Sequence, residues 1–122
     1  MNSFISYLDS IEQLKKEKKY DLAWGKANEA VVNLKASGSE DWYMLYYQMA
    51  DILARENKWM DALEKMGLCI HYLGRLGGVT HERFVLRLLK KINQENKLND
   101  YVDIVKKSQP RDIAGELQKL IA

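Results

Sequence analysis

The side chains that could bind a transition metal or act as a nucleophile are Cys69, His71 and His81. Cys69 and His71 are two positions apart on a predicted helix, so they point to different faces, and His81 follows a glycine break. A lone cysteine cannot complete a structural zinc site, and Cys69 falls on a small packing position, which favours a core thiol. Both histidines are expected at the surface. The sequence therefore predicts no metal, no cofactor and no catalytic residue.

The glycine-containing segment Gly74-Arg75-Leu76-Gly77-Gly78 is the nearest approach to a phosphate-binding loop. No strand pattern precedes it and no Lys-Ser or Lys-Thr pair follows it, so it lacks the context of a P-loop. The HExxH and GxSxG patterns of zinc proteases and serine hydrolases are also missing. We therefore expect a protein that is not an enzyme.

Length, composition and charge are typical of one small domain. A chain of 122 residues can bury a sizeable core, and its single cysteine excludes an internal disulfide, which fits a reducing compartment. The first residues are amphipathic, and no apolar run reaches about 18 residues, so neither a signal peptide nor a membrane span is expected. The net charge of +2, with both signs interspersed, does not indicate a nucleic-acid partner. We expect a cytoplasmic protein that does not contact membranes.

A local phrase recurs three times, at equal intervals, in a composition that favours helix. Its copies are Glu17-Lys18-Lys19-Tyr20, Glu56-Asn57-Lys58-Trp59 and Glu95-Asn96-Lys97-Leu98. Apolar residues follow helical spacing on both sides of each phrase, so the phrase is expected to form the polar turn between two helices. The sequence thus predicts three helical pairs in one register.

The joints between the repeats carry helix start and stop signals. Gly38 and Ser39 are expected to end one helix and cap the next. The pair Gly77-Gly78 is expected to end another helix, with Thr80 as the following cap. Pro110 is expected to open a last helix, because its missing N–H costs nothing there. With no partner of its own, that helix would cover the exposed edge of the third repeat.

These residues resemble the tetratricopeptide repeat. The segment Trp59–Leu63 is similar to the start of the second helix of such a repeat, and Ala50 fills the small position of the first helix. Tyr20–Trp24 matches the same pattern. Leu89 and Tyr101 replace small residues in the third repeat, and the 39-residue period exceeds the usual 34 of the family.

The resemblance implies an all-α fold of three stacked antiparallel helical hairpins, a tetratricopeptide-like right-handed α-solenoid, with a C-terminal capping helix. It implies a single domain, 1–122. The repeats are expected at about 3–37, 40–77 and 80–108, and the capping helix at 110–121.

Tetratricopeptide-like arrays present the first helix of each hairpin on a concave face, which commonly holds a peptide or helix of a partner. Carried onto this sequence, the resemblance implies a groove that grades from an apolar end to a charged end, as suits an amphipathic helix or an extended peptide. The alternative is that these are ordinary solvated helix faces. The groove residues expected are Leu8, Glu12, Lys15, Met44, Tyr47, Asp51, Arg55, Arg83, Leu86, Arg87 and Lys90.

Four aromatic residues gather at the start of the second repeat. Trp42 and Tyr46 are expected to pack inside, whereas Tyr43 and Tyr47 are four positions apart and share another face. Tyrosine is favoured at the energetic centres of interfaces, so this pair could anchor a partner. For Tyr43, packing between the hairpins is the alternative interpretation.

The function predicted from these observations is protein–protein interaction, as a small adaptor or chaperone-like protein. Some members of the family bind a C-terminal carboxylate, and Arg83, Arg87 and Gln48 resemble part of that site. Leu8 and Glu12 replace its remaining polar residues, and the acid would repel a carboxylate.

Two other functions stay open. Nucleic-acid binding would use basic pairs such as Lys90-Lys91 and Lys106-Lys107, although acids interrupt every basic stretch. A homodimer is the other alternative, and it could involve Trp24 on the first hairpin.

Overall fold

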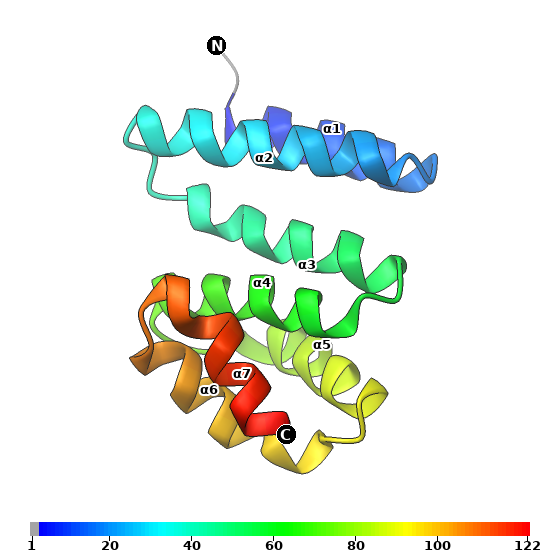
Figure 1. Cartoon of the computed structure of the whole chain (residues 1–122). Helices are drawn as coiled ribbons and strands as arrows, with labels where there is room; N and C mark the ends of the chain where they lie inside the picture. The colour runs from blue at the N-terminus through cyan, green and yellow to red at the C-terminus, as the bar shows by residue number, and fades with distance from the viewer. Residues whose placement is uncertain (1–2) are drawn as a thin grey trace.

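The computed structural model describes residues 3–122, and over these residues the chain is all-helical. Consecutive helices are joined by short connections (Figure 1). No helix in this part of the chain is long and apolar enough to cross a membrane. The α-helices are α1 (Phe4–Lys16), α2 (Tyr20–Ala36), α3 (Leu45–Arg55), α4 (Trp59–Leu73), α5 (Gly78–Lys91), α6 (Leu98–Lys107) and α7 (Ile113–Ile121). Three 3-10 turns precede α3, α6 and α7, namely η1 (Trp42–Met44), η2 (Glu95–Lys97) and η3 (Pro110–Asp112).

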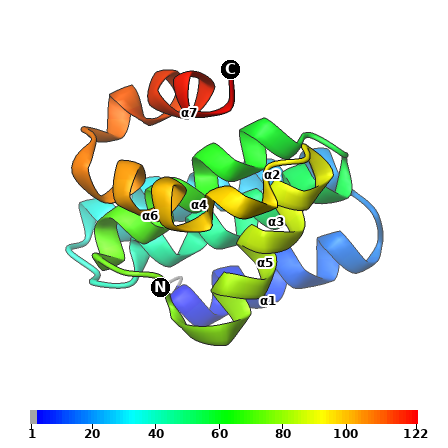
Figure 2. The same cartoon turned by 90° about the horizontal axis from the view of Figure 1, so that it is seen from below.

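The first four helices form two pairs that lie one above the other in Figure 1. Within each pair the chain reverses direction, so that α1 packs on α2 and α3 packs on α4, and α2 also contacts α3. Seen from below in Figure 2, α1 and α5 lie toward one side of the molecule, and α7 lies at the opposite side. This arrangement leaves α3 between α1 and α5.

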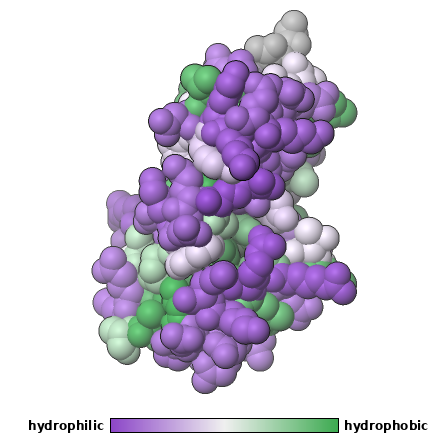
Figure 3. Space-filling view, turned by 90° about the vertical axis from the view of Figure 1, so that its right-hand side faces the viewer, coloured by the Kyte–Doolittle hydropathy of each residue, from purple (hydrophilic) through white to green (hydrophobic). Residues whose placement is uncertain are grey.

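The polar turn predicted between two helices is confirmed in the first two repeats. Lys18 and Asn57, which occupy the same place in their two phrases, both adopt a left-handed conformation, with φ of 59° and 62°. In each turn the next residue donates its backbone N–H to a carbonyl five residues earlier, at 2.9 Å. The same local phrase therefore produces the same turn. Both turns lie at the right-hand side of Figure 1, and Figure 3 shows that mostly hydrophilic side chains cover that side of the molecule.

The third turn does not lie where the repeat register predicts. Asn93 has φ of 60°, and the Gln94 N–H donates to the Leu89 carbonyl at 2.8 Å, so the turn falls three residues early. The predicted turn residues 95–97 form η2 instead. Asparagine tolerates the left-handed conformation, which explains why α5 can end before it. Because α6 still begins at Leu98, the three extra residues are taken up by the 3-10 turn.

The joints between the repeats also differ from the prediction. Gly74, with φ of 84°, ends α4, and Gly78 already lies inside α5. Thr80 does not cap α5. Instead, the backbone N–H of Gly77 at the start of α5 donates to Nδ1 of His81 at 3.1 Å. Ser39 does accept a hydrogen bond at its joint, from the Asp41 N–H at 3.3 Å, but η1 separates it from α3.

Two apolar clusters form the core. The smaller one lies between α1, α2 and α3, and the larger one joins α3, α4, α5, α6 and α7. Trp24 packs partly buried against both clusters. Cys69 is 1% exposed inside the larger cluster, which confirms the predicted core thiol. Burial raises the pKa of this thiol to about 11, so it stays protonated and unreactive at neutral pH.

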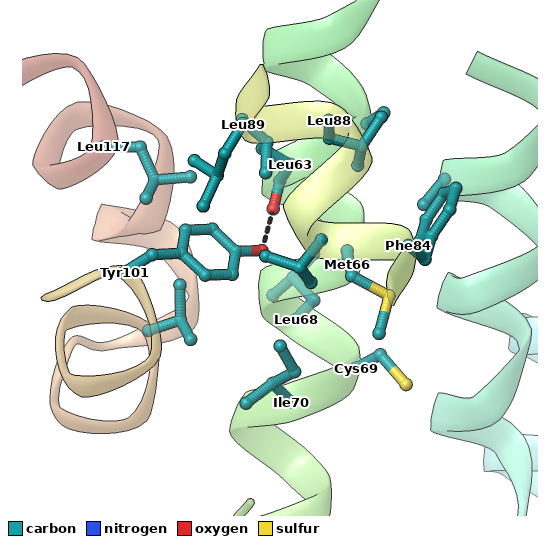
Figure 4. Packing of buried hydrophobic residues seen from close by; sticks show 14 of the residues in the cluster. Leu63, Met66, Leu68, Cys69, Ile70, Phe84, Leu88, Leu89, Tyr101 and Leu117 are labelled. Atoms are coloured by element: carbon teal, nitrogen blue, oxygen red, sulfur yellow. Dashed lines mark hydrogen bonds between the residues drawn. The ribbon is translucent and has the colours of Figure 1, made fainter. Parts of the chain in front are cut away.

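Tyr101 sets the packing of the last three helices. It is fully buried and donates its hydroxyl hydrogen to the Leu63 carbonyl of α4 at 2.6 Å (Figure 4). Its ring occupies a position that is small in the other two repeats, Ala23 and Ala62, so α6 packs mainly on α4 and little on α5. Gly67 of α4 permits this approach, because a Cβ there would lie 2.8 Å from a methyl group of Val105. Helix α7 then covers α6 and α4.

Candidate protein-binding groove

A groove lies where α1 and α5 flank α3. Side chains of α3 bridge to both neighbours: Asp51 contacts Lys15 of α1, and Tyr47 contacts Phe84 of α5. The groove contains an apolar pocket near the start of α3 and a charged pocket near its end. A polar network lies between the two pockets.

The apolar pocket has a volume of about 200 Å³. Residues of α1, η1, α3, α4 and α5 meet there, and none of them is an acid, a lysine or an arginine. Met44 is 43% exposed at its mouth, which is high for a large apolar side chain. The lining residues are Phe4, Leu8, Tyr43, Met44, Tyr47, Gln48, Cys69, Leu73 and His81.

Tyr47 links the apolar pocket to the charged part of the groove. Its ring stacks on His81 at 5.2 Å between centroids and is tilted against Phe84 at the same distance. Burial and then the nearby Asp51 carboxylate raise the pKa of Tyr47, so its hydroxyl remains neutral. The ring is therefore held in place by two aromatic contacts and offers an apolar wall with a polar tip.

The polar network is built on a lysine that is almost fully buried. Lys15 is 4% exposed, and its ammonium lies 2.7 Å from Asp51 Oδ2, 2.7 Å from Gln48 Oε1 and 3.1 Å from Glu12 Oε1. Asp51 also accepts from Arg55 Nε at 3.0 Å. Three partners satisfy the three ammonium hydrogens, which is what allows the charge to be buried.

The Asp51 carboxylate is held in its charged form. Burial raises its pKa, but hydrogen bonds and charge from Lys15 and then Arg55 outweigh that effect, and the pKa lies below its ordinary value. Glu12 and Asp51 are thus neutralised by the two cations that contact them. The centre of the groove is polar but close to zero net charge.

The charged pocket continues the groove beyond Asp51. It is lined by Asp51, Ala54, Arg55, Trp59, Arg87 and Lys91. The Arg87 guanidinium lies 5.2 Å from the centroid of Phe84, and the Lys91 ammonium lies 5.3 Å from that of Trp59. Cations therefore rest on aromatic faces here, and they outnumber the acids.

The groove residues expected from the sequence fall into four groups. Leu8, Met44 and Tyr47 line the apolar pocket, and Arg87 lines the charged pocket. Glu12, Lys15, Asp51 and Arg55 meet in the polar network. The structure does not bring Arg83, Leu86 and Lys90 into either pocket; Arg83 and Lys90 are exposed on α5 and Leu86 is half-buried.

Several lining residues were missed by the sequence reasoning. Phe4, Leu73 and Lys91 lie at helix ends, and the placement of such ends depends on tertiary packing. Tyr43 and Tyr47 do share the pocket, as their spacing of four suggested. Gln48 follows Tyr47 directly in the sequence. Its role as a partner of Lys15 could not be predicted, because the burial of Lys15 was not predicted.

The two histidines, expected at the surface, are less exposed than that expectation implies. His71 is half-buried, with Nδ1 2.8 Å from the Val105 carbonyl, so that Nδ1 must carry the hydrogen. His81 is also half-buried, but its Nδ1 accepts the Gly77 N–H and must be bare. A Cβ at Gly77 would overlap the His81 ring, so this close contact requires glycine. Neither position carried a signal for burial in the sequence.

Comparison of the chain with protein-family models, curated proteins and solved structures finds no match. The resemblance to tetratricopeptide repeats therefore stays a prediction that rests on the residues themselves. No group of three or more histidine, cysteine, aspartate or glutamate residues within 3–122 is arranged to hold a metal ion.

Proposed function

We propose that this chain is a protein–protein interaction module, a small adaptor or chaperone-like protein that binds a peptide or helix segment of another protein in the groove of α1, α3 and α5. One observation carries the proposal. An apolar pocket without formal charge lies beside a cation-rich pocket on the same face, with a satisfied polar network between them. Such a surface can bury an apolar anchor and also fix the register of a chain.

The proposal also includes the way in which the helices are arranged as repeats. Three stacked hairpins in a right-handed, tetratricopeptide-like solenoid would place the first helix of each repeat on one face. Support comes from the equal turns at Lys18 and Asn57 and from the equal spacing of Tyr20, Trp59 and Leu98, which begin α2, α4 and α6. The early turn at Asn93 and the weak contact between α5 and α6 make the third hairpin the least regular of the three.

The groove is prepared for binding before a partner arrives. Lys15 ties α1 to α3 through Gln48 and Asp51, and Tyr47 is fixed by its two aromatic neighbours. Because these side chains of the groove are already ordered, binding a partner costs less conformational entropy than it would if binding had to order them. Binding energy would then come mainly from the side chain that enters the apolar pocket.

Nucleic-acid binding receives less support. Lys15 is buried in an ion pair, and Lys19 and Lys107 each contact a carboxylate at 2.8 and 3.0 Å. These lysines would have to exchange existing partners for phosphates. Self-association through the groove is the other alternative, and the same experiment distinguishes it.

The test compares two apolar-to-acid changes on opposite faces. Met44→Glu puts a charge at the mouth of the apolar pocket, whereas Val32→Glu changes a residue that is 65% exposed on α2, away from the groove. Each variant is used to capture proteins from a lysate, with nuclease in one arm and at two salt concentrations. Crosslinking with mass spectrometry then maps the contact, and sedimentation measures self-association.

Nuclease-resistant partners crosslinked to the groove, retained by Val32→Glu and lost by Met44→Glu, are the expected result. Partners that bind both variants equally would place the interface elsewhere and contradict the proposal. Capture abolished by nuclease would instead indicate nucleic acid. A dimer that only Met44→Glu dissociates would indicate a second copy in the groove.

A further inference from the structure

The charges along α5 are divided between two faces. Its one acid, Glu82, lies in a hollow with Leu98 and Val102, on the side of α6. Arg87 and Lys91 line the groove, and Arg83 and Lys90 are exposed beside them. The charged part of the groove is therefore lined by two cations of α5, and two more cations lie exposed on the same helix.

These four cations lack carboxylate partners. Among residues 3–122, every ion pair of the groove joins Lys15 or Arg55 to Glu12 or Asp51. No acid of the described chain lies within ion-pair distance of Arg83, Arg87, Lys90 or Lys91. Two adjoining parts of one groove thus differ: α1 and α3 balance their own charges, and α5 does not.

We infer that the segment bound in the groove is acidic, with one apolar side chain seated in the apolar pocket and carboxylates placed against Arg87 and Lys91. This inference rests on the proposed function and names the class of its partner. Carboxylates on the segment would supply the negative partners that the cations of α5 lack. The aromatic faces behind Arg87 and Lys91 hold both cations in position. The carboxylates meant are those of side chains within the segment.

The size of the apolar pocket limits what enters it. A cavity of about 150 Å³ holds one benzene molecule, so the pocket volume of about 200 Å³ suits one aromatic or branched side chain. Sites for drug-sized molecules are larger, from about 300 Å³ upward. The pocket is therefore matched to an anchor residue rather than to a free small molecule.

The spacing between anchor and acid follows from α3. This helix lines the apolar pocket through Tyr47 and the charged pocket through Asp51 and Arg55. At 1.5 Å per residue the two pockets are separated by roughly 6 to 12 Å along the helix axis. A bound helix would then carry its acid about four to eight residues from the anchor, and an extended segment about two to four.

The experiment selects binders from a displayed library of random 16-residue peptides, without bias in charge. Selected peptides are synthesised and titrated against the wild type, the charge reversal Arg87→Glu/Lys91→Glu, and the control Lys106→Glu/Arg111→Glu. The control reverses two exposed cations on α6 and η3, away from the groove. Circular dichroism checks that every variant is folded, and Met44→Glu identifies the peptides that use the groove.

We expect groove-binding peptides to be enriched in Asp and Glu at the stated spacing from an apolar residue. The Arg87→Glu/Lys91→Glu variant should bind them at least about tenfold more weakly at low salt, with a smaller loss at high salt, and the control should bind like the wild type. Groove-binding peptides without acidic enrichment, or insensitive to the charge reversal, would overturn this inference and leave the proposed function standing.

Two further outcomes overturn the inference. If no selected peptide loses affinity in Met44→Glu, the groove is not a peptide site and the proposed function fails with it. If a single-stranded oligonucleotide, titrated in parallel, binds more tightly than the peptides and is weakened by the same charge reversal, the cations of α5 serve phosphates instead.

Discussion

Two contacts between distant segments show how the halves of this molecule differ. Lys15 of α1 reaches Asp51 of α3 across 36 residues, and Tyr101 of α6 reaches Leu63 of α4 across 38 residues. The first contact is an ion pair inside a network of five polar side chains. The second is one hydrogen bond at the edge of an aromatic ring that is otherwise surrounded by apolar groups (Figure 4). Two contacts with nearly equal sequence separation thus differ in chemistry: one is an ion pair in a polar network, and the other is a hydrogen bond in an apolar core.

The difference follows from what each contact borders. The Lys15 network lies on the floor of the groove, where water and a partner can reach Glu12 and Arg55. Tyr101 and Leu63 are both fully buried, so the hydrogen bond between them is shielded from solvent. Buried ion pairs add little to stability compared with well-packed apolar groups, but they constrain geometry. The α1–α3 contact therefore fixes the shape of a surface, and the α4–α6 contact stabilises the core.

Removal of the Tyr101 ring should have the largest effect on stability. Tyr101→Ala deletes a fully buried aromatic side chain and leaves a cavity between α4, α6 and α7, so the free energy of unfolding should fall by about 3–5 kcal/mol. Tyr101→Phe removes only the hydroxyl and should cost about 1 kcal/mol. Urea denaturation measures both. Equal losses in the two variants would show that the hydrogen bond, rather than the ring, stabilises this half.

Removal of the buried lysine should be next in size. Lys15→Met keeps an unbranched side chain, one atom shorter than lysine, but leaves Asp51 with Arg55 alone, and the expected loss of stability is about 2–3 kcal/mol. The double variant Lys15→Met/Asp51→Leu should lose less than the sum of its single variants, because neither charge is left unpaired. Urea denaturation of all three measures the coupling.

Lys26→Met, which breaks an exposed pair of 3.1 Å with Glu29, is the control and should change stability by less than about 0.5 kcal/mol. Additive losses would mean that the network is not coupled.

The third change tests how closely α4 and α6 approach. Gly67→Ala places a methyl group 2.8 Å from Val105, and the repacking should outweigh the gain in helix propensity, with a net loss of about 1–2 kcal/mol. Gly25→Ala is the matched control, because nothing lies within 4 Å of the added Cβ. That variant should gain about 0.5–1 kcal/mol from the better helix former. Thermal unfolding of both variants measures the difference, and a stabilised Gly67→Ala would contradict the close approach.

The sequence predicted the elements that depend on local signals. Tyr20, Trp59 and Leu98 begin α2, α4 and α6 as the repeat spacing indicated, because an aromatic or apolar residue after a polar turn is a local pattern. The third turn could not be placed in this way. Asn93 and Asn96 both tolerate the left-handed conformation, and only the packing of α5 and α6 on α4 selects Asn93.

The candidate site was predictable in part for a related reason. Helical spacing places Met44 and Tyr47 on one face, the resemblance to tetratricopeptide repeats adds Leu8, and the structure brings all three to one pocket. Burial of Lys15 has no local signal, since lysine is usually exposed and its partners Gln48 and Asp51 belong to a different helical pair. Sequence periodicity thus gives the direction of a side chain, whereas burial of a charge depends on partners that only the fold assembles.

The two histidines make opposite hydrogen bonds through Nδ1. The Nδ1 of His71 carries a hydrogen for the Val105 carbonyl of α6. The Nδ1 of His81 accepts the Gly77 N–H at the start of α5, and protonation converts this acceptor into a second donor. The groups around His81 are Tyr43, Tyr47 and Cys69 in the pocket and the Arg75 guanidinium beside it.

The smallest effect that we predict is a loss of stability in mild acid that depends on His81. Burial and then the charge of Arg75 lower the pKa of His81 below its ordinary value of 6.5. The unfolded chain therefore binds this proton first, and the free energy of unfolding should decrease as the pH falls from 6.5 toward the lower pKa of the folded state. His81→Gln should remove this part of the pH dependence, and His71→Gln, the control, should retain it. Urea denaturation between pH 5 and 8 measures both, at about half-unit steps, with the unfolded value near 6.5 as reference. Equal pH profiles for the wild type and His81→Gln would show that the bond to Gly77 does not depend on a bare Nδ1, and the apolar pocket would then keep its wall in acid.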